Sequence, residues 1–335
     1  MKTGRIAVVG AGIAGLTAAQ SLARGKHDLV VFEKARGVGG RTSTRRRETY
    51  AFDHGAQYFT CRGSEDFSRQ VDDWCNRGVA AAWDAPIRTL GGGEATKTRE
   101  QPIRYVGVPG MSALARDLAT ELRVECGQRI ESIERSATSW HLINEEGSAL
   151  GGFDAVVVAT PAPQAVPLLA PVPRLAELVG GVEMQPCHAV MVTFPESIGV
   201  EFGGAFVAEP PLAWVARNAS KPERASGECW VLHASPEWSA LHLEEPTDTV
   251  ARSLLRAFAE VLRRELPIAS SHAAHRWLFA RTTRPLGTPF LWDADSRIGV
   301  CGDWTHGARV EDAFTSGKLL ARAMLGEQML TASHA

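Results

Sequence analysis

The glycine-rich run GAGIAG at residues 10–15 constrains the fold of this chain more than any other segment. A short apolar run at 6–9 precedes it, and small and apolar residues with helical spacing follow at 13–23. A second apolar run comes next, at 28–32. This order of strand, helix and strand predicts a parallel unit with a right-handed crossover, which opens a doubly wound α/β sheet.

The glycine run and Glu33 together predict a dinucleotide site. Glycines let the backbone turn sharply and approach a pyrophosphate, and the start of the following helix supplies free N–H groups. A carboxylate at the end of the second strand accepts hydrogen bonds from both ribose hydroxyls and would repel a 2′-phosphate. The residues predicted to lie along the phosphates are Gly10, Gly12, Ile13, Ala14 and Gly15.

The segment after Glu33 distinguishes FAD from NAD. Residues 34–42, KARGVGGRT, resemble the second phosphate motif of the glutathione-reductase-type FAD proteins and of the amine oxidase superfamily. The paired glycines open space, and Arg41 supplies charge for a diphosphate that extends further than a mononucleotide. The segment therefore favours FAD over NAD.

Two later segments extend this resemblance. Residues 156–161, VVVATP, look like the mid-chain strand that lies under FAD. Residues 301–303, CGD, followed by AFTSGK at 313–318, look like the C-terminal motif in which Asp303 holds the ribitol and a helix N-terminus faces the flavin ring. Four motifs in this order imply FAD as the cofactor. The further residues implied in binding it are Lys34, Gly40, Arg41, Gln57, Ile130, Ala159, Thr160, Gly302, Asp303 and Val310.

Apolar strands at 155–159 and 298–301 predict one sheet assembled from three distant parts of the chain. The intervening region reads differently, with strand patterns at 189–194 and 229–233 separated by turns rich in proline and glycine. We predict an α/β fold, in which a Rossmann-type FAD-binding domain is interleaved with a sheet-rich substrate domain. The expected boundaries are 1–62, 105–163 and 293–333 for the FAD-binding domain, and 63–104 and 164–292 for the substrate domain.

Six segments resemble the bacterial renalases. They are RGVGGR at 36–41, DHGAQYFT at 53–60, VPGMS at 108–112, ARNASKPER at 216–224, HRWL at 275–278 and CGDW at 301–304. The resemblance spans almost the whole chain, and it implies a fold similar to p-hydroxybenzoate hydroxylase with non-covalent FAD. It also implies oxidation of 2-dihydro or 6-dihydro isomers of NAD(P)H, with electrons passed to O2 to give NAD(P)+ and hydrogen peroxide.

This reaction needs positioning more than acid or base catalysis, because a hydride leaves a dihydropyridine without removal of a proton. We predict Gln57 and Tyr58 near the flavin ring, with stabilisation of the preceding turn as the alternative role. His233 is either a substrate contact or a core histidine. Trp277 and Trp304 are the candidates for a hydrophobic wall beside the nicotinamide.

A flavin-dependent amine oxidase is the alternative enzyme class. Such an enzyme is expected to enclose a neutral amine in an aromatic cage, yet the chain has only Tyr50, Tyr58 and Tyr105. None of these tyrosines lies in the C-terminal flavin motif, where Trp304 stands instead. A non-enzymatic flavin-binding module is least favoured, since polar residues cluster in the predicted substrate domain.

Charge and composition limit the partners. The chain has 36 Lys plus Arg and 38 Asp plus Glu, a net charge of −2, so we expect neither nucleic acid nor an anionic membrane as a partner. Five prolines interrupt the most apolar stretch, 155–173, and the N-terminus lacks a secretory pattern, which predicts a cytoplasmic protein. The six cysteines form no C-x-x-C pair, so we expect no metal site. The predicted partners are a small-molecule dihydronicotinamide dinucleotide and O2, and the sequence leaves a homodimer open.

Overall fold

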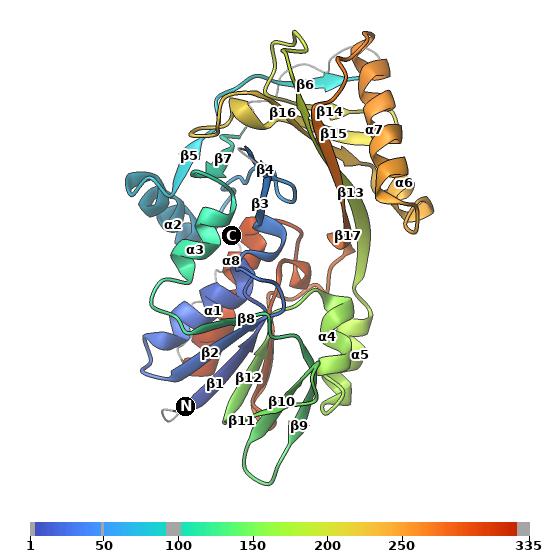
Figure 1. Cartoon of the computed structure of the whole chain (residues 1–335). Coiled ribbons are helices and arrows are strands. Elements are labelled where there is room, and N and C mark those ends of the chain that lie inside the picture. The colour runs from blue at the N-terminus through green and yellow to red at the C-terminus, as the bar shows by residue number, and fades with distance from the viewer. Residues whose placement is uncertain (1–3, 48–49, 92–101, 327–335) are drawn as a thin grey trace.

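The computed structural model describes residues 4–47, 50–91 and 102–326 (Figure 1). Its first sheet has six strands in the order β18-β19-β12-β1-β2-β8, and all neighbours are parallel except β18 and β19. The strands are β1 (Arg5–Val9), β2 (Asp28–Glu33), β8 (Val124–Cys126), β12 (Ala155–Val158), β18 (Leu291–Asp293) and β19 (Ile298–Val300). The predicted α/β fold, with a parallel sheet drawn from distant segments, is confirmed.

Alternate residues of each central strand enter different cores, because successive side chains of a strand point to opposite faces. Ile6 and Val8 join a buried cluster on the side of helices α1 (Ile13–Ala23) and α8 (Val310–Leu325). Ala7 and Val9 join a second cluster on the other face. That face is covered by α4 (Ala162–Leu168), α5 (Pro173–Gly180) and a three-stranded sheet of β9 (Ile130–Arg135), β10 (Trp140–Asn144) and β11 (Ala149–Phe153).

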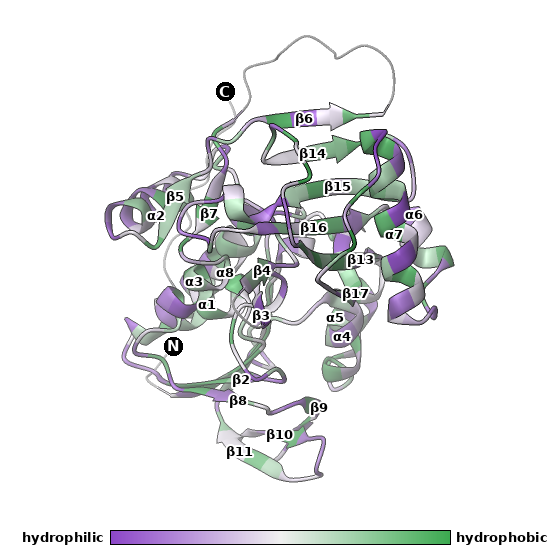
Figure 2. Ribbon diagram, turned by 45° about the horizontal axis from the view of Figure 1, so that its top comes forward, coloured by the Kyte–Doolittle hydropathy of each residue, from purple (hydrophilic) through white to green (hydrophobic). Residues whose placement is uncertain are grey.

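The second sheet also has six strands, in the order β17-β13-β16-β15-β14-β6. They are β6 (Ile87–Leu90), β13 (Glu183–Phe194), β14 (Gly204–Val207), β15 (Leu212–Arg217), β16 (Glu228–Ala234) and β17 (Ser271–Arg284). One face packs on α7 (Thr247–Leu262), through residues such as Leu232 and Phe258. In Figure 2, α7 carries both hydrophobic and hydrophilic residues, as expected for a helix with one face on a sheet and the other in solvent. The short helix α6 (Pro236–Leu241) lies next to it (Figure 1).

The smaller elements connect the two sheets. They are the hairpin of β3 (Thr44–Arg47) and β4 (Tyr50–Asp53), α2 (Glu65–Asn76), the pair β5 (Ala80–Ala82) and β7 (Tyr105–Gly107), α3 (Ser112–Leu118), and the 3-10 turns η1 (Gly40–Thr42), η2 (Asn218–Ser220) and η3 (Asp303–Thr305). One buried cluster extends from Ile6 in the first sheet through Phe67 in α2 to Trp214 in the second. The domain boundaries given above therefore stay a proposal. Within the described residues, no helix is both long enough and apolar enough to cross a bilayer.

Helices α1 and α8 approach each other so closely that their backbones are in contact. A Cβ atom added to Gly317 of α8 would overlap the carbonyl oxygen of Ala14 in α1. Glycine is required at this position because any side chain would push the two helices apart.

We expect Gly317→Ala to destabilise the protein by about 1–3 kcal/mol, the usual cost of forcing an extra methyl group into a packed interior. The measurement is the free energy of unfolding in urea. Gly180→Ala, at the end of α5, is the matched control because a Cβ there meets no atom within 4 Å. Equal stability of the two variants would show that α1 and α8 can separate without cost.

Candidate functional site

The carboxyl ends of the parallel strands meet at one edge of the first sheet, where ligands of open α/β sheets usually bind. Gly12 follows β1 there, and a Cβ on this residue would meet no atom within 4 Å. Gly40 faces it, since a Cβ on Gly40 would lie 3.7 Å from the Cα of Gly12. The Gly39 N–H also donates to the Ala11 carbonyl at 2.8 Å. The two glycine motifs therefore lie side by side around an open space.

Glu33 is fixed at the end of β2 beside this space. Its carboxylate accepts hydrogen bonds from the N–H groups of Ala11 at 2.9 Å and Ala35 at 2.8 Å. Each oxygen keeps a lone pair that can accept a ribose hydroxyl. The next residue, Lys34, donates to the side chain of Gln164 at 3.0 Å, and Ile130 packs into the core at the start of β9.

Two further segments border this edge. One follows β12, and the other precedes α8. A Cβ on Gly10 would lie 2.8 Å from the Ala159 carbonyl oxygen, so these two strand ends are in contact. The Thr160 hydroxyl is buried and has no hydrogen-bond partner within the described structure. A buried hydroxyl of this kind can form a hydrogen bond with a group bound beside it. The N–H of Gly302 is satisfied by Ser316 Oγ at 2.9 Å.

Arg41 and Asp303, predicted from separate motifs, form an ion pair with each other. Arg41 Nη1 lies 2.9 Å from Asp303 Oδ2, and Nη2 donates to Oδ1. The Arg41 carbonyl also accepts from the Ala56 N–H at 2.9 Å. The second phosphate motif is thus bound both to the C-terminal motif and to the segment 53–60.

The segment 53–60 begins at Asp53, which is completely buried with two cations. Asp53 Oδ2 lies 2.7 Å from Arg224 Nη2 and 3.4 Å from Lys221 Nζ. Its Oδ1 accepts from the N–H of Met111 at 2.8 Å and from the hydroxyl of Thr44 at 2.8 Å. No sequence pattern marks these residues as a site, although Asp53, Lys221 and Arg224 all lie in the renalase-like segments.

These groups shift one another's ionisation. Burial alone would raise the pKa of Asp53, but the charges of Lys221 and Arg224 outweigh burial and hold that pKa below its usual value. Burial lowers the pKa of Lys221 to about 8, against the opposing effect of Asp53. One carboxylate is shared by two cations, so the cluster carries an excess positive charge while Lys221 is protonated.

Gln57 is held inside this network. Its Nε2 donates to the carbonyl groups of Asp53 and Gly55, and its Oε1 accepts from Lys221 Nζ at 3.2 Å. These hydrogen bonds agree with the alternative role predicted for Gln57, which is to stabilise the preceding turn. Contact between Gln57 and the flavin stays a prediction.

The inner face of the second sheet lies against the same segment. The His54 carbonyl accepts from His233 Nε2 at 3.1 Å and from Trp277 Nε1 at 3.0 Å. Burial lowers the pKa of His54 to about 3 and that of His233 to about 4, so both imidazoles are neutral near pH 7. Tyr58 packs on Trp214 with ring centroids 5.5 Å apart.

Trp304 lies in the protein core and not beside the predicted nicotinamide site. Its side chain is 0% exposed, and its indole N–H donates to the Thr160 carbonyl at 3.0 Å. The turn η3 directs the indole into the core behind β12, where it packs with the cluster that contains Val158. A side chain without exposed surface cannot form a wall beside a substrate, so this assignment is corrected.

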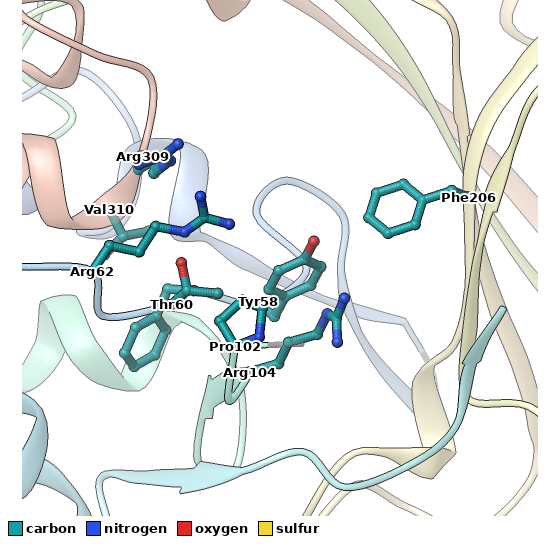
Figure 3. A pocket seen from close by; sticks show the side chains of 9 residues that line it. Tyr58, Thr60, Arg62, Pro102, Arg104, Phe206, Arg309 and Val310 are labelled. Carbon is teal, nitrogen blue, oxygen red and sulfur yellow. The ribbon is translucent and has the colours of Figure 1, made fainter. Parts of the chain in front are cut away.

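A cavity of about 260 Å³ lies next to Tyr58 and is bordered by Val310, the first residue of α8 (Figure 3). Phe206 of β14 stands on its opposite side. The cavity therefore lies between the end of the segment 53–60, the N-terminus of α8 and the inner face of the second sheet.

Two family models match this chain. Residues 8–74 match an NAD(P)-binding Rossmann-like domain, and residues 68–325 match the flavin containing amine oxidoreductase family. The chain belongs to this amine oxidoreductase family. Its cofactor is FAD.

Two solved structures of similar fold align with nearly the whole of this chain. A putative protoporphyrinogen oxidase from Exiguobacterium sp. 255-15 has a TM-score of 0.75 at 15% identity, over 98% of this chain and 100% of that one. A putrescine oxidase bound to putrescine has a TM-score of 0.70 at 14% identity, over 97% and 99%. At these identities the likeness concerns the fold alone.

A curated relative matches only locally. The 4,4′-diapophytoene desaturase of Staphylococcus aureus strain Newman is 43% identical over 51 residues, which cover 15% of this chain. The match spans 10% of the length of the desaturase. It therefore carries no inference about the substrate.

The edge of the first sheet fits the FAD of this amine oxidoreductase family. The space between Gly12 and Gly40 would admit a diphosphate, Glu33 would hold the ribose, and Thr160 offers an unpartnered hydroxyl. We assign the diphosphate and ribitol to the neighbourhood of Arg41 and Asp303 as a proposal.

We expect Gly12→Val to lose FAD while keeping the fold, because the new side chain enters the open space and meets no protein atom. The measurements are the ratio of flavin to protein absorbance after purification and the Tm of the flavin-free protein. Gly180→Val serves as the control and should retain flavin. A yellow Gly12→Val protein with full flavin content would place the phosphates elsewhere.

We expect Asp53→Asn to destabilise the protein by about 3–5 kcal/mol, because two buried cations lose their shared carboxylate. Adding Lys221→Met to this variant should recover part of the loss, since one uncompensated charge is then removed. Urea unfolding of the single and double variants measures the coupling. Additive losses would contradict the charge-sharing explanation.

Because the pKa of Asp53 is lowered, the contribution of its carboxylate to the stability of the protein depends on pH. Stability from this carboxylate is present above the unfolded pKa of about 3.9 and is lost as the pH falls through the lower folded pKa. The Asp53→Asn variant should therefore lose less stability than the parent protein when the pH falls below about 4.

Proposed function

We propose that this chain is a renalase-like FAD-dependent oxidase. It takes a hydride from 2-dihydro isomers of NAD(P)H, with the 6-dihydro isomers as further candidate donors, and holds its FAD non-covalently. The donor, O2 and one proton give NAD(P)+ and hydrogen peroxide. The amine oxidoreductase family contributes the flavin chemistry, and the donor is the part that we propose.

One observation carries the proposal: a single network of contacts includes a residue from each of the six segments that resemble the bacterial renalases. Within the segment 53–60, Asp53 binds Met111 of 108–112 and Arg224 of 216–224.

The other three segments join the same network. The His54 carbonyl accepts from Trp277 of 275–278. Ala56 donates to Arg41 of 36–41, which in turn pairs with Asp303 of 301–304. Segments separated by up to 262 residues are thus in direct contact, which supports a shared function for them.

The chemistry of the described residues agrees with a hydride donor. Bound FAD supplies the hydride acceptor and the route of the electrons to O2. Tyr58 and Trp277 are partly exposed and offer flat apolar surfaces on which a nicotinamide ring can be oriented. Hydride departure needs no base, so the neutral state of His54 and His233 is compatible with this role.

Amine oxidation is the second candidate, since the family model and the fold of putrescine oxidase both favour it. Aromatic rings around Tyr58 would suit a neutral amine.

The decisive experiment is anaerobic stopped-flow mixing of the purified holoprotein with 2-dihydro-NAD(P), 6-dihydro-NAD(P), ordinary 1,4-dihydro NADH and benzylamine. We expect the 2-dihydro isomer to bleach the flavin fastest and each NAD(P)+ formed in air to be matched by one hydrogen peroxide. Bleaching by benzylamine with no reaction of either unusual isomer would establish the second candidate instead.

The pH dependence of the same measurement separates the two donors. Reduction by the 2-dihydro isomer should change little between about pH 5.5 and 7, because His54 and His233 remain neutral there and the lowered pKa of Lys221 is about 8. Reduction by an amine should rise steeply with pH over that range, since the neutral fraction of an amine with a pKa near 10 increases about tenfold per pH unit.

A further inference from the structure

The cavity beside Tyr58 is lined by residues from four parts of the chain. They are Tyr58, Phe59, Thr60, Arg62, Pro102, Arg104, Phe206, Arg309 and Val310. Three of these residues are arginines and none is acidic. Figure 3 shows Arg62 and Arg309 on one side of the cavity and Arg104 beside Tyr58. A guanidinium keeps its charge at all physiological pH values, so each of the three arginines brings a positive charge to the described lining.

The two acidic residues that follow Val310 in the sequence accept hydrogen bonds from backbone N–H groups. Glu311 accepts from the N–H groups of residues 62, 63 and 64 at 2.9, 3.1 and 2.9 Å. Asp312 accepts from the N–H groups of Ala308 and Arg309, both at 2.9 Å. Within the described part of the chain, neither Arg62 nor Arg309 forms a side-chain ion pair. The two carboxylates thus hold the backbone from which both arginines project.

The cavity borders Val310, the first residue of α8, so it adjoins the helix N-terminus that the resemblance assigns to the flavin ring. The guanidinium group binds phosphate through several parallel hydrogen bonds. A volume of about 260 Å³ is small for a whole dinucleotide but suits part of one.

We propose that Arg62, Arg104 and Arg309 form the subsite for the diphosphate of the substrate. This inference rests on the proposed function, because it assigns one part of the dihydronicotinamide dinucleotide to this cavity. The nicotinamide half then extends from the cavity past Tyr58.

A second cavity adjoins the first, and we assign the adenosine half of the dinucleotide to it. It has a volume of about 440 Å³ and shares Pro102 and Arg104 with the first. Its other lining residues include Ile87, Arg88 and Ile103. A ligand whose diphosphate is held at Arg104 can continue directly into this second cavity with its adenosine.

The test uses three donors that share the 2-dihydronicotinamide ring: the riboside without phosphate, the mononucleotide and the dinucleotide. In the parent holoprotein, the Kd from flavin bleaching should be at least about tenfold higher for the riboside than for the dinucleotide. Arg62→Ala and Arg309→Ala should each raise the Kd of the dinucleotide about tenfold to a hundredfold and leave that of the riboside unchanged. Arg62→Lys should lie between the parent and the alanine variant, because it keeps the charge but loses the planar fork.

A control and a binding measurement accompany the kinetics. Arg252→Ala, on the exposed surface of α7, should behave as the parent protein. Calorimetric titration with NAD+ reports binding without turnover, and its affinity should fall with rising salt in the parent more than in the double variant Arg62→Ala/Arg309→Ala.

The outcomes separate the subsite from the proposed function. If all three donors bleach the flavin with equal Kd in every variant, the subsite is refuted and the proposed function stands. If no dihydronicotinamide donor bleaches the flavin, the proposed function fails, and titration with inorganic pyrophosphate then decides on the cavity. Saturable binding that is lost in the double variant would support an anion subsite, and the absence of binding to the parent would overturn it.

Discussion

The ion cluster of Asp53 is the interaction on which the rest of the site depends. A buried carboxylate with two cations is held only where each charge has its partners, because an unpaired charge in a protein interior is very costly. Asp53 meets this condition through Lys221 and Arg224, and it also binds the backbone before α3. The cluster thereby fixes the start of the segment 53–60, whose later residues reach both the cofactor edge and the second sheet.

This arrangement connects cofactor and substrate through a rigid segment rather than through a flexible loop. Ala56 is bonded to Arg41 on the cofactor side, and the His54 carbonyl receives two hydrogen bonds from the second sheet. Tyr58 then reaches the cavity lined by the three arginines. Sites of this kind hold their geometry because the supporting residues are themselves bonded and packed. The flavin edge and the cavity are consequently kept in a fixed relation by one short stretch of chain.

The cofactor edge could be predicted from the sequence because its determinants are local. The glycines at 10–15, Glu33 and the parallel strands follow from spacing and residue type alone. The Asp53 cluster could not be found in this way, since Lys221 lies 168 residues from Asp53 and nothing in the spacing pairs them. Trp304 was misassigned because the residue after a strand end can turn either toward the cavity or into the core. Both outcomes leave the same sequence pattern, and only the packing behind β12 decides between them.

The arginines of the cavity were missed for a related reason. Arg62, Arg104 and Arg309 are isolated charges in the sequence, and only the fold brings them to one place.

The sequence also does not show which face of each strand of the second sheet lines the site. Residues of both faces of β13 are buried, so alternation does not reveal which side chains line the site. Cross-strand pairing resolves this, because Phe206 is paired with Trp214, and Trp214 with His233, on one face.

The buried cluster that runs from Ile6 through Phe67 to Trp214 has a consequence for how the molecule unfolds. Two lobes with separate cores can melt one after the other, whereas a shared core obliges them to melt together. Packing between the rings of Phe67 and Phe314, with centroids 5.3 Å apart, ties α2 to α8 within that core. Heating should therefore produce one cooperative calorimetric transition for the nucleotide sheet and the substrate sheet, and the flavin should be released in the same event.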